Sequence, residues 1–131
     1  MEKLVQRFQK LLSQTTTSFL RYNHQTIDWN DRMTAIVGAR GVGKTTLILQ
    51  HIKLHHSLKD TLYVSADDFY FSEHKLLEFA EDFHKLGGKH LFVDEIHKYN
   101  GWSKEMKLIY DYLPNLQVTF TGSSILDIFR G

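Results

Sequence analysis

The stretch MTAIVGARGVGKTT, residues 33–46, predicts the fold of this chain. Its first five residues, which are apolar or β-branched, are typical of a short buried strand that stops at Gly38. The residues from Gly38 onward match a glycine loop written as Gly, four residues, then Gly-Lys-Ser/Thr. Leucine and isoleucine then recur at helical spacing, so we expect a helix directly after the loop. A strand, a glycine loop and a helix in this order predict an α/β domain with a phosphate-binding loop.

The glycine loop has the residue types that bind a polyphosphate. Glycines allow the backbone to wrap closely around the phosphates, so that main-chain N–H groups converge on the oxygens beside a positive helix N-terminus. Lys44 would bridge the outer phosphates, Thr45 would offer its hydroxyl to Mg²⁺, and Thr46 would donate to the inner phosphate. A glycine-rich turn without a ligand is the alternative, but the position of the loop between strand and helix favours phosphate binding. The residues expected to bind the nucleotide are Gly38, Ala39, Arg40, Gly41, Val42, Gly43, Lys44, Thr45 and Thr46.

Two carboxylates follow a second apolar run, LFVDE at residues 91–95. Acidic residues at the end of a buried strand are unfavourable unless a cation or water uses them. Asp94 would hold a water on Mg²⁺ beside Thr45, while Glu95, directed the opposite way by strand alternation, would deprotonate the water that attacks the γ-phosphate. An adjacent glutamate favours hydrolysis over the transfer to a bound acceptor that kinases catalyse. A solvated acidic turn is the alternative interpretation.

The polar stretch TGSS, residues 121–124, follows the last expected strand. Parallel strands present their carboxyl ends on one edge, so these residues would lie near Asp94 if this strand lies between the first and the third. Ser123 or Ser124 would then sense the γ-phosphate or position the attacking water. One of these serines is also expected to cap a helix beginning at Ile125, which is compatible with the first role.

The remaining elements follow from hydrophobic periodicity and from residues that start or stop helices. Gly87 and Gly88 are expected to end one helix, while Ser103 caps another that Pro114 stops. Strands and helices alternate, which predicts parallel βαβ units with helices on both faces of the sheet. We expect helices at 2–13, from the glycine loop to Asp60, at 76–86 and at 103–113, and strands at 33–37, 62–64, 90–93 and 117–121.

Length and composition limit what the chain can be. Its 131 residues leave room for one globular unit, which we divide into a helical flank at 1–32 and a core at 33–131. The net charge of +1 gives no overall field that would favour nucleic acid or an anionic membrane, and no run of about 18 apolar residues predicts a membrane span. The absence of cysteine excludes thiolate metal ligands and thiol nucleophiles, and we expect a cytoplasmic location.

Three motifs together, GARGVGKTT, LFVDE and TFTGSS, with YVSADD and HKYNGWSKEMK between them, resemble the AAA+ type ATPases, especially a large prokaryotic group of ATP-binding proteins. The resemblance implies a three-layer P-loop NTPase fold of the ASCE/AAA+ type, with a parallel sheet flanked by helices and with ATP and Mg²⁺ as cofactors. It implies a Walker A loop at 38–46, a Walker B strand ending in Asp94 with Glu95 as the catalytic glutamate, and sensor 1 at Ser123 or Ser124. It also implies that the sensor 1 strand flanks the Walker A strand.

The chain departs from the family pattern in two respects. Sensor 1 is often Asn or Thr in these proteins, whereas a serine stands here. Such proteins also continue into an arginine finger and a helical lid, so we expect a truncated domain without its lid that turns ATP over slowly. The missing part would carry contacts with a protein partner or with further copies of the chain. Within the chain, the expected catalytic residues are Lys44, Glu95 and Ser123.

Two other functions are compatible with the same motifs. A nucleotide-gated switch would bind ATP and recruit a partner without efficient turnover. The run Asp94-Glu95-Ile96-His97 also resembles the DExH box of superfamily 2 helicases, although the chain is too short for a second RecA-like domain and has no basic stripe with aromatic stacking partners. Stimulation of turnover by RNA or DNA would distinguish a helicase from the other two functions.

Other polar residues have plainer interpretations. His51, His55 and His56 are expected to face solvent rather than to bind a metal, because no carboxylate or cysteine completes the set. Asp67 and Asp68 follow a strand and are expected to form a turn or cap a helix.

Overall fold

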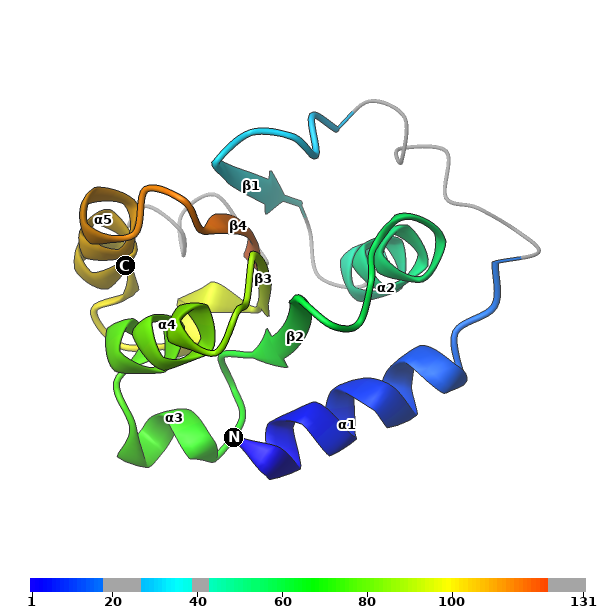
Figure 1. The fold of residues 1–131 in the computed structure, drawn as a ribbon, viewed down its shortest axis with the longest axis horizontal. Coiled ribbons are helices and arrows are strands. Elements are labelled where there is room, and N and C mark those ends of the chain that lie inside the picture. The colour runs from blue at the N-terminus through cyan, green and yellow to red at the C-terminus, as the bar shows by residue number, and fades with distance from the viewer. Residues whose placement is uncertain (18–26, 39–42, 123–131) are drawn as a thin grey trace.

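The computed structural model describes residues 1–17, 27–38 and 43–122 of the chain (Figure 1). Strands and helices alternate from residue 33 onward, as the sequence predicts. The helices are α1 (Glu2–Ser13), α2 (Lys44–His55), α3 (Tyr70–Glu73), α4 (Leu76–Lys85) and α5 (Trp102–Tyr112), with a 3-10 turn, η2, at Ile96–Lys98. The strands are β1 (Met33–Val37), β2 (Thr61–Ser65), β3 (His90–Asp94) and β4 (Gln117–Gly122).

The sheet formed by the described residues has four parallel strands in the order β1-β4-β3-β2. The last of these strands in the chain therefore lies between the first and the third, as the resemblance implied. The register places Val37 opposite Gly122 and Ser65 opposite Asp94, so neighbouring strands end level with one another. Their carboxyl ends consequently meet at one edge of the sheet, next to the glycine loop that follows β1.

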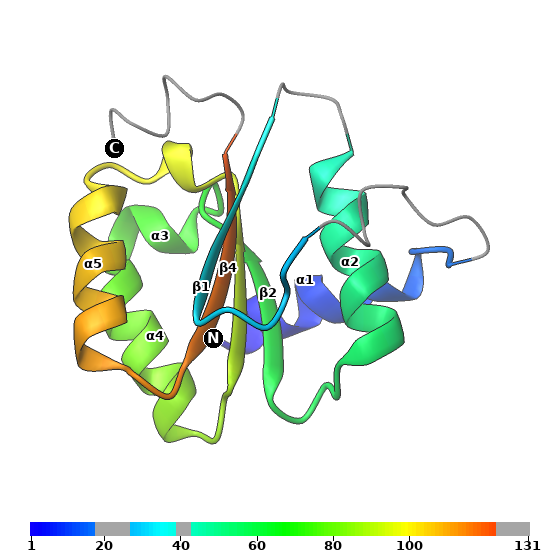
Figure 2. The same ribbon diagram turned by 90° about the horizontal axis from the view of Figure 1, so that it is seen from above.

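Helices cover both faces of the sheet. Figure 2 shows α1 and α2 on one face and α3, α4 and α5 on the other. Leu91 and Val93 of the inner strand β3 are fully buried, which explains why this strand is a continuous apolar run. The predicted α/β class and its three-layer arrangement are confirmed. Among the helices that the structure describes, none has the length and apolar character needed to cross a membrane.

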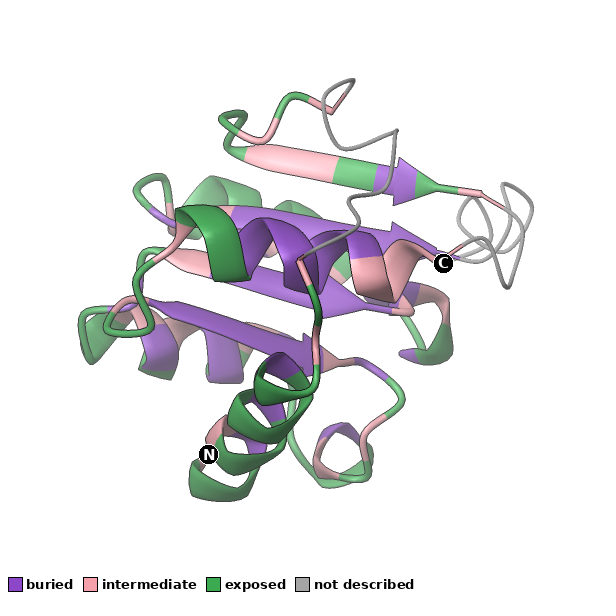
Figure 3. Cartoon of the chain, turned by 90° about the vertical axis from the view of Figure 1, so that its right-hand side faces the viewer, coloured by how far each residue is buried: buried purple, intermediate pink, exposed green. Residues whose placement is uncertain are grey.

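Helix α1 packs on β2 and α2 through one apolar face (Figure 3). Leu4, Phe8 and Leu12 are buried on this face, and most of the residues between them are polar and exposed. The Lys53 ammonium of α2 donates to the carbonyl oxygens of Leu12 and Thr15, at 3.2 and 2.7 Å. These contacts hold the C-terminal end of α1 against the neighbouring helix.

Helix α4 ends at a glycine pair, as predicted. The N–H groups of Gly87 and Gly88 donate to the carbonyl oxygens of His84 and Phe83. Gly87 has φ +99°, a left-handed conformation that glycine adopts without strain. The chain can therefore reverse direction there and enter β3.

Two predicted helix boundaries are wrong. Helix α2 ends at His55 and not at Asp60, because His56 has an extended backbone and its ring packs edge-on against an aromatic ring of β3. Helix α5 begins after Gly101, whose φ of 77° makes the turn. Ser103 therefore lies inside the helix and does not cap it.

Candidate nucleotide-binding site

The glycine loop connects β1 to α2 at the carboxyl edge of the sheet. Gly43 precedes α2 with φ +80°, a left-handed conformation that explains why the pattern needs glycine before the lysine. The Lys44 ammonium donates to the Gly38 carbonyl oxygen at 2.9 Å, so this side chain folds back to the residue at which the loop begins. Four residues expected to bind phosphate lie outside the described residues, namely Ala39, Arg40, Gly41 and Val42.

Asp94 lies at the end of β3 and is only 3% exposed. Its Oδ2 atom accepts hydrogen bonds from the Thr45 hydroxyl and from the Tyr63 hydroxyl, the latter at 2.6 Å. Its Oδ1 atom accepts from the Thr121 hydroxyl and from the Glu95 main-chain N–H, the latter at 3.1 Å. Donors from α2, β2 and β4 thus converge on one carboxylate, as a buried charge requires. The structure brings Thr45 and Asp94 into contact, as expected.

Two residues of this cluster, Tyr63 and Thr121, lie within the stretches YVSADD and TFTGSS, but neither had a predicted role there. Tyr63 resembles the apolar residues around it in β2, and Thr121 resembles an ordinary β-branched strand residue. Burial raises the pKa of Tyr63 well above its usual value, and the negative charge of Asp94 raises it further, so the hydroxyl stays a donor. A buried hydroxyl needs a hydrogen-bond partner. A residue with a hydroxyl inside an otherwise apolar strand is therefore the sequence feature that could have identified both residues.

Glu95 follows the strand rather than belonging to it. Strand β3 ends at Asp94, and Glu95 has φ 54° and ψ 49°, so strand alternation does not set the direction of its side chain as we expected. Glu95 is the one non-glycine residue with positive φ in the described part of the chain. Its N–H also donates to the Thr121 hydroxyl at 2.9 Å. Such a backbone costs about 1–3 kcal/mol, persists where surrounding contacts hold it, and is common at functional sites.

The arrangement of loop, strand and carboxylate agrees with a comparison against known families. The family model described as AAA domain matches residues 30–131. The chain belongs to the AAA domain family. It is therefore a nucleotide-binding ATPase domain of the AAA type, as the motifs indicated. No curated protein matches the chain. The match does not include α1, and the division of the chain into 1–32 and 33–131 stays a prediction.

The sensor 1 candidates of this AAA domain, Ser123 and Ser124, lie outside the described residues. Strand β4 ends at Gly122, directly before them in the chain. The preceding residue, Thr121, contacts Asp94, so β4 reaches the same cluster as the glycine loop does. The roles assigned to the two serines stay predictions.

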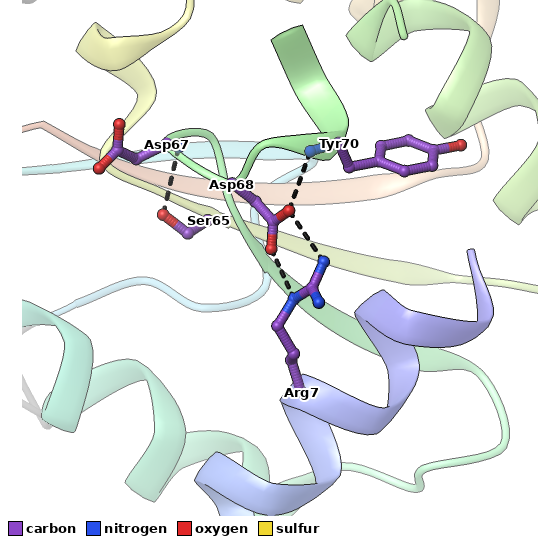
Figure 4. Close-up of polar contacts among 5 residues, drawn as sticks. All are labelled: Arg7, Ser65, Asp67, Asp68 and Tyr70. Carbon is purple, nitrogen blue, oxygen red and sulfur yellow. Dashed lines mark hydrogen bonds and ion pairs between the residues drawn. The ribbon is translucent and has the colours of Figure 1, made fainter. Parts of the chain in front are cut away.

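The two aspartates after β2 form a turn and an ion pair (Figure 4). Asp68 accepts from the Tyr70 main-chain N–H at 3.0 Å and pairs with the Arg7 guanidinium at 2.7 and 2.9 Å. The Asp67 main-chain N–H donates to the Ser65 hydroxyl at 3.2 Å. The predicted turn-forming role is confirmed, and Asp68 in addition connects α1 to the loop after β2.

A histidine cluster lies at the opposite edge of the sheet, where β3 begins. His51 is 6% exposed, its ring stacks on Trp29 at a centroid distance of 3.8 Å, and its Nε2 lies 3.1 Å from that of His56. The expectation that these histidines face solvent is wrong for His51, because Trp29 covers it, and for His56, which is half-buried within the cluster, whereas His55 is exposed. Burial and then the nearby His90 lower the pKa of His56 to about 4. The described residues contain no group of three or more His, Cys, Asp or Glu side chains arranged to hold a metal.

Proposed function

We propose that this AAA domain binds Mg-ATP at the carboxyl edge of its sheet and hydrolyses it. The contact between Thr45 and Asp94 carries the proposal. The two residues are 49 positions apart in the chain, and each is the residue that its own motif assigns to Mg²⁺. Two separate motifs that meet at one point support a single nucleotide site.

The loop at 38–46 would bind the phosphates. The Lys44 ammonium, which donates to the Gly38 carbonyl oxygen, would instead donate to phosphate oxygens when the nucleotide is bound. Helix α2 begins at Lys44, so its N-terminal N–H groups and partial positive charge are directed at the same place. Loss of the Lys44 charge should therefore remove most of the affinity for ATP.

The oxygen atoms of Thr45 and Asp94 are of the kind that Mg²⁺ takes as ligands. This ion prefers oxygen ligands and usually takes one or two from the protein, with water and phosphate oxygens completing its shell. The Thr45 hydroxyl and the Asp94 carboxylate supply oxygens of this kind at one point. When bound, Mg²⁺ would neutralise charge on the outer phosphates.

Glu95 would act as the general base. Its main-chain N–H donates to Asp94 and to Thr121, so its backbone is held beside the carboxylate that we assign to Mg²⁺. From there it would accept the proton of the water that attacks the γ-phosphate. Ser123 would position that water or sense the γ-phosphate, as the family resemblance implies.

Calorimetric titration with Mg-ATP tests the binding site. We expect the parent protein to bind and Lys44→Ala to lose most of its affinity. Lys59→Ala is the matched control, because Lys59 is an exposed lysine outside the site. Equal ATP affinity in Lys44→Ala and the parent would overturn the assignment of the loop.

Phosphate release tests hydrolysis. Glu95→Gln should bind Mg-ATP and release phosphate about 10²- to 10⁴-fold more slowly, the usual contribution of a general base. Unchanged slow release in this variant would instead favour a nucleotide switch without efficient turnover. Stimulation of release by RNA or DNA, abolished by His97→Ala, would favour the helicase function over the AAA-type function.

We further propose that ATP turnover is coupled to a protein partner or to further copies of the chain. Light scattering with and without Mg-ATP would detect assembly of the chain. A mass that does not change with nucleotide would favour a different partner protein over self-association.

A further inference from the structure

The Tyr63 hydroxyl donates to the same carboxylate oxygen as Thr45 does. Tyr63 is 5% exposed, and its hydroxyl lies 2.6 Å from Oδ2 of Asp94. The Thr45 hydroxyl contacts that oxygen from the start of α2. Oδ2 therefore has one donor next to the glycine loop and one from the interior of the sheet.

The two donors would respond differently to Mg²⁺. The Thr45 hydroxyl is assigned to the ion, so it would be shared between Mg²⁺ and Asp94 once the ion is bound. Tyr63 lies within β2 and has no role in either motif, so its hydrogen bond would stay. We propose that Tyr63 is a positioning residue, which holds the Asp94 carboxylate in the orientation that Mg²⁺ requires. This inference rests on the proposed function.

Tyr63 is itself held from two sides. Within the sheet it lies opposite Phe92, two positions before the pair formed by Ser65 and Asp94, so strand pairing sets its place relative to the carboxylate. Against α1, its ring stacks on Phe8 with centroids 6.3 Å apart and planes inclined by 29°. Helix α1 lies outside residues 30–131, so the family match does not include this support.

The hydrogen bonds to the other carboxylate oxygen, Oδ1, cannot replace the restraint that Tyr63 places on Oδ2. Oδ1 is bound by the Thr121 hydroxyl of β4 and by the N–H of Glu95, which directly follows β3. If Tyr63 lost its hydroxyl, Thr45 would be the remaining donor that the structure describes at Oδ2. With the Thr45 hydroxyl shared with the ion, the carboxylate would be less restrained against rotation about its side-chain bonds. A buried tyrosine loses little entropy in preventing this, because few of its bonds rotate.

Tyr63→Phe tests the inference, because it removes the hydroxyl and keeps the ring that stacks on Phe8. The matched control is Tyr99→Phe. Tyr99 is also buried, at 9% exposed, and its hydroxyl donates at 2.6 Å to a different carboxylate, that of Glu105. The measurement is the affinity for a fluorescent ATP derivative, first in EDTA and then during titration with Mg²⁺.

We expect Tyr63→Phe to raise, by about fivefold or more, the Mg²⁺ concentration that gives half of the maximal gain in ATP affinity. A change of this size is usual when a hydrogen bond to a charged group is lost. Tyr99→Phe should stay within about twofold of the parent, and affinity in EDTA should change little in either variant. A shift in Tyr63→Phe no larger than in Tyr99→Phe, or an equal loss of affinity with and without Mg²⁺, would overturn the positioning role.

A replacement variant and the Mg²⁺ dependence of the parent protein complete the test. Should thermal unfolding show that Tyr63→Phe does not fold, Phe8→Leu replaces it, because it loosens the ring and leaves the hydroxyl in place. This variant should also raise the Mg²⁺ requirement, and an unchanged requirement would overturn the inference. A parent protein whose ATP affinity does not depend on Mg²⁺ would overturn the proposed function itself, and the inference with it.

Discussion

The main-chain N–H of Glu95 donates to the Thr121 hydroxyl at 2.9 Å, and that hydroxyl in turn donates to Asp94. Thr121 is fully buried in β4, 26 positions after Glu95 in the chain. One side chain thus restrains both the carboxylate assigned to Mg²⁺ and the backbone of the residue assigned as general base.

Thr121→Val should weaken both the fold and catalysis. Valine keeps the shape of threonine but leaves the Glu95 N–H and Asp94 without this partner, so we expect the free energy of unfolding to fall by about 1–3 kcal/mol. Phosphate release should fall more than ATP affinity, because Glu95 loses a contact that fixes its backbone.

Thr119→Val is the control for this experiment. Thr119 lies in the same strand, two residues earlier, and is 2% exposed. Denaturant unfolding measures stability, and a phosphate-release assay measures turnover. Equal losses in the two variants would contradict a specific role for Thr121.

The ion pair between Arg7 and Asp68 should stabilise the docking of α1 modestly. The guanidinium contacts both carboxylate oxygens, but the Arg7 side chain is 51% exposed and that of Asp68 is 14% exposed. We expect Arg7→Gln to lower the free energy of unfolding by about 0.2–1 kcal/mol, with a smaller effect in high salt.

Lys107→Gln provides a comparison, because Lys107 and Asp111 form a more exposed pair within one helix, with side chains 76% and 45% exposed. Its effect on stability should be smaller than that of Arg7→Gln. A loss in Arg7→Gln that does not depend on salt would show that packing, and not charge, holds α1 at this point.

Acid should destabilise the protein through His56. Its pKa is about 4 in the folded chain and 6.5 when exposed, with burial first and His90 second among the causes. Between these two values the unfolded chain binds a proton that the folded chain does not. The free energy of unfolding should therefore fall as pH drops from 6.5 toward 4, by on the order of 1 kcal/mol once solvent screening is considered.

His56→Gln should flatten this part of the stability profile. His74→Gln is the control, because His74 is exposed and directly follows α3, a helix on the opposite face of the sheet from α2 (Figure 2). The measurement is denaturant unfolding at a series of pH values. An unchanged slope in His56→Gln would contradict the assignment of this pH dependence to His56.

The glycine loop and the acid at the end of β3 could be predicted because each is a local pattern. Gly43 has the positive φ that the pattern requires, and Asp94 ends a run of apolar residues that β3 buries. The expected position of β4 between β1 and β3 came from the family resemblance, and the sheet confirms it. These features depend on neighbours in sequence or on a known strand order.

The features that could not be predicted depend on contacts between distant elements. Tyr63 becomes part of the site only through the register of β2 and β3. His51 is buried because Trp29, from the segment before β1, covers it, and helical periodicity cannot reveal this. The four-residue helix α3 is too short to show a period.

A crystal structure with Mg²⁺ and a non-hydrolysable ATP analogue tests the central claim most directly. The account predicts phosphates within the loop at 38–46, the Thr45 hydroxyl on the metal, and Asp94 beside it. Phosphates bound elsewhere, or a metal with no contact to Thr45 and Asp94, either direct or through one water, would contradict it.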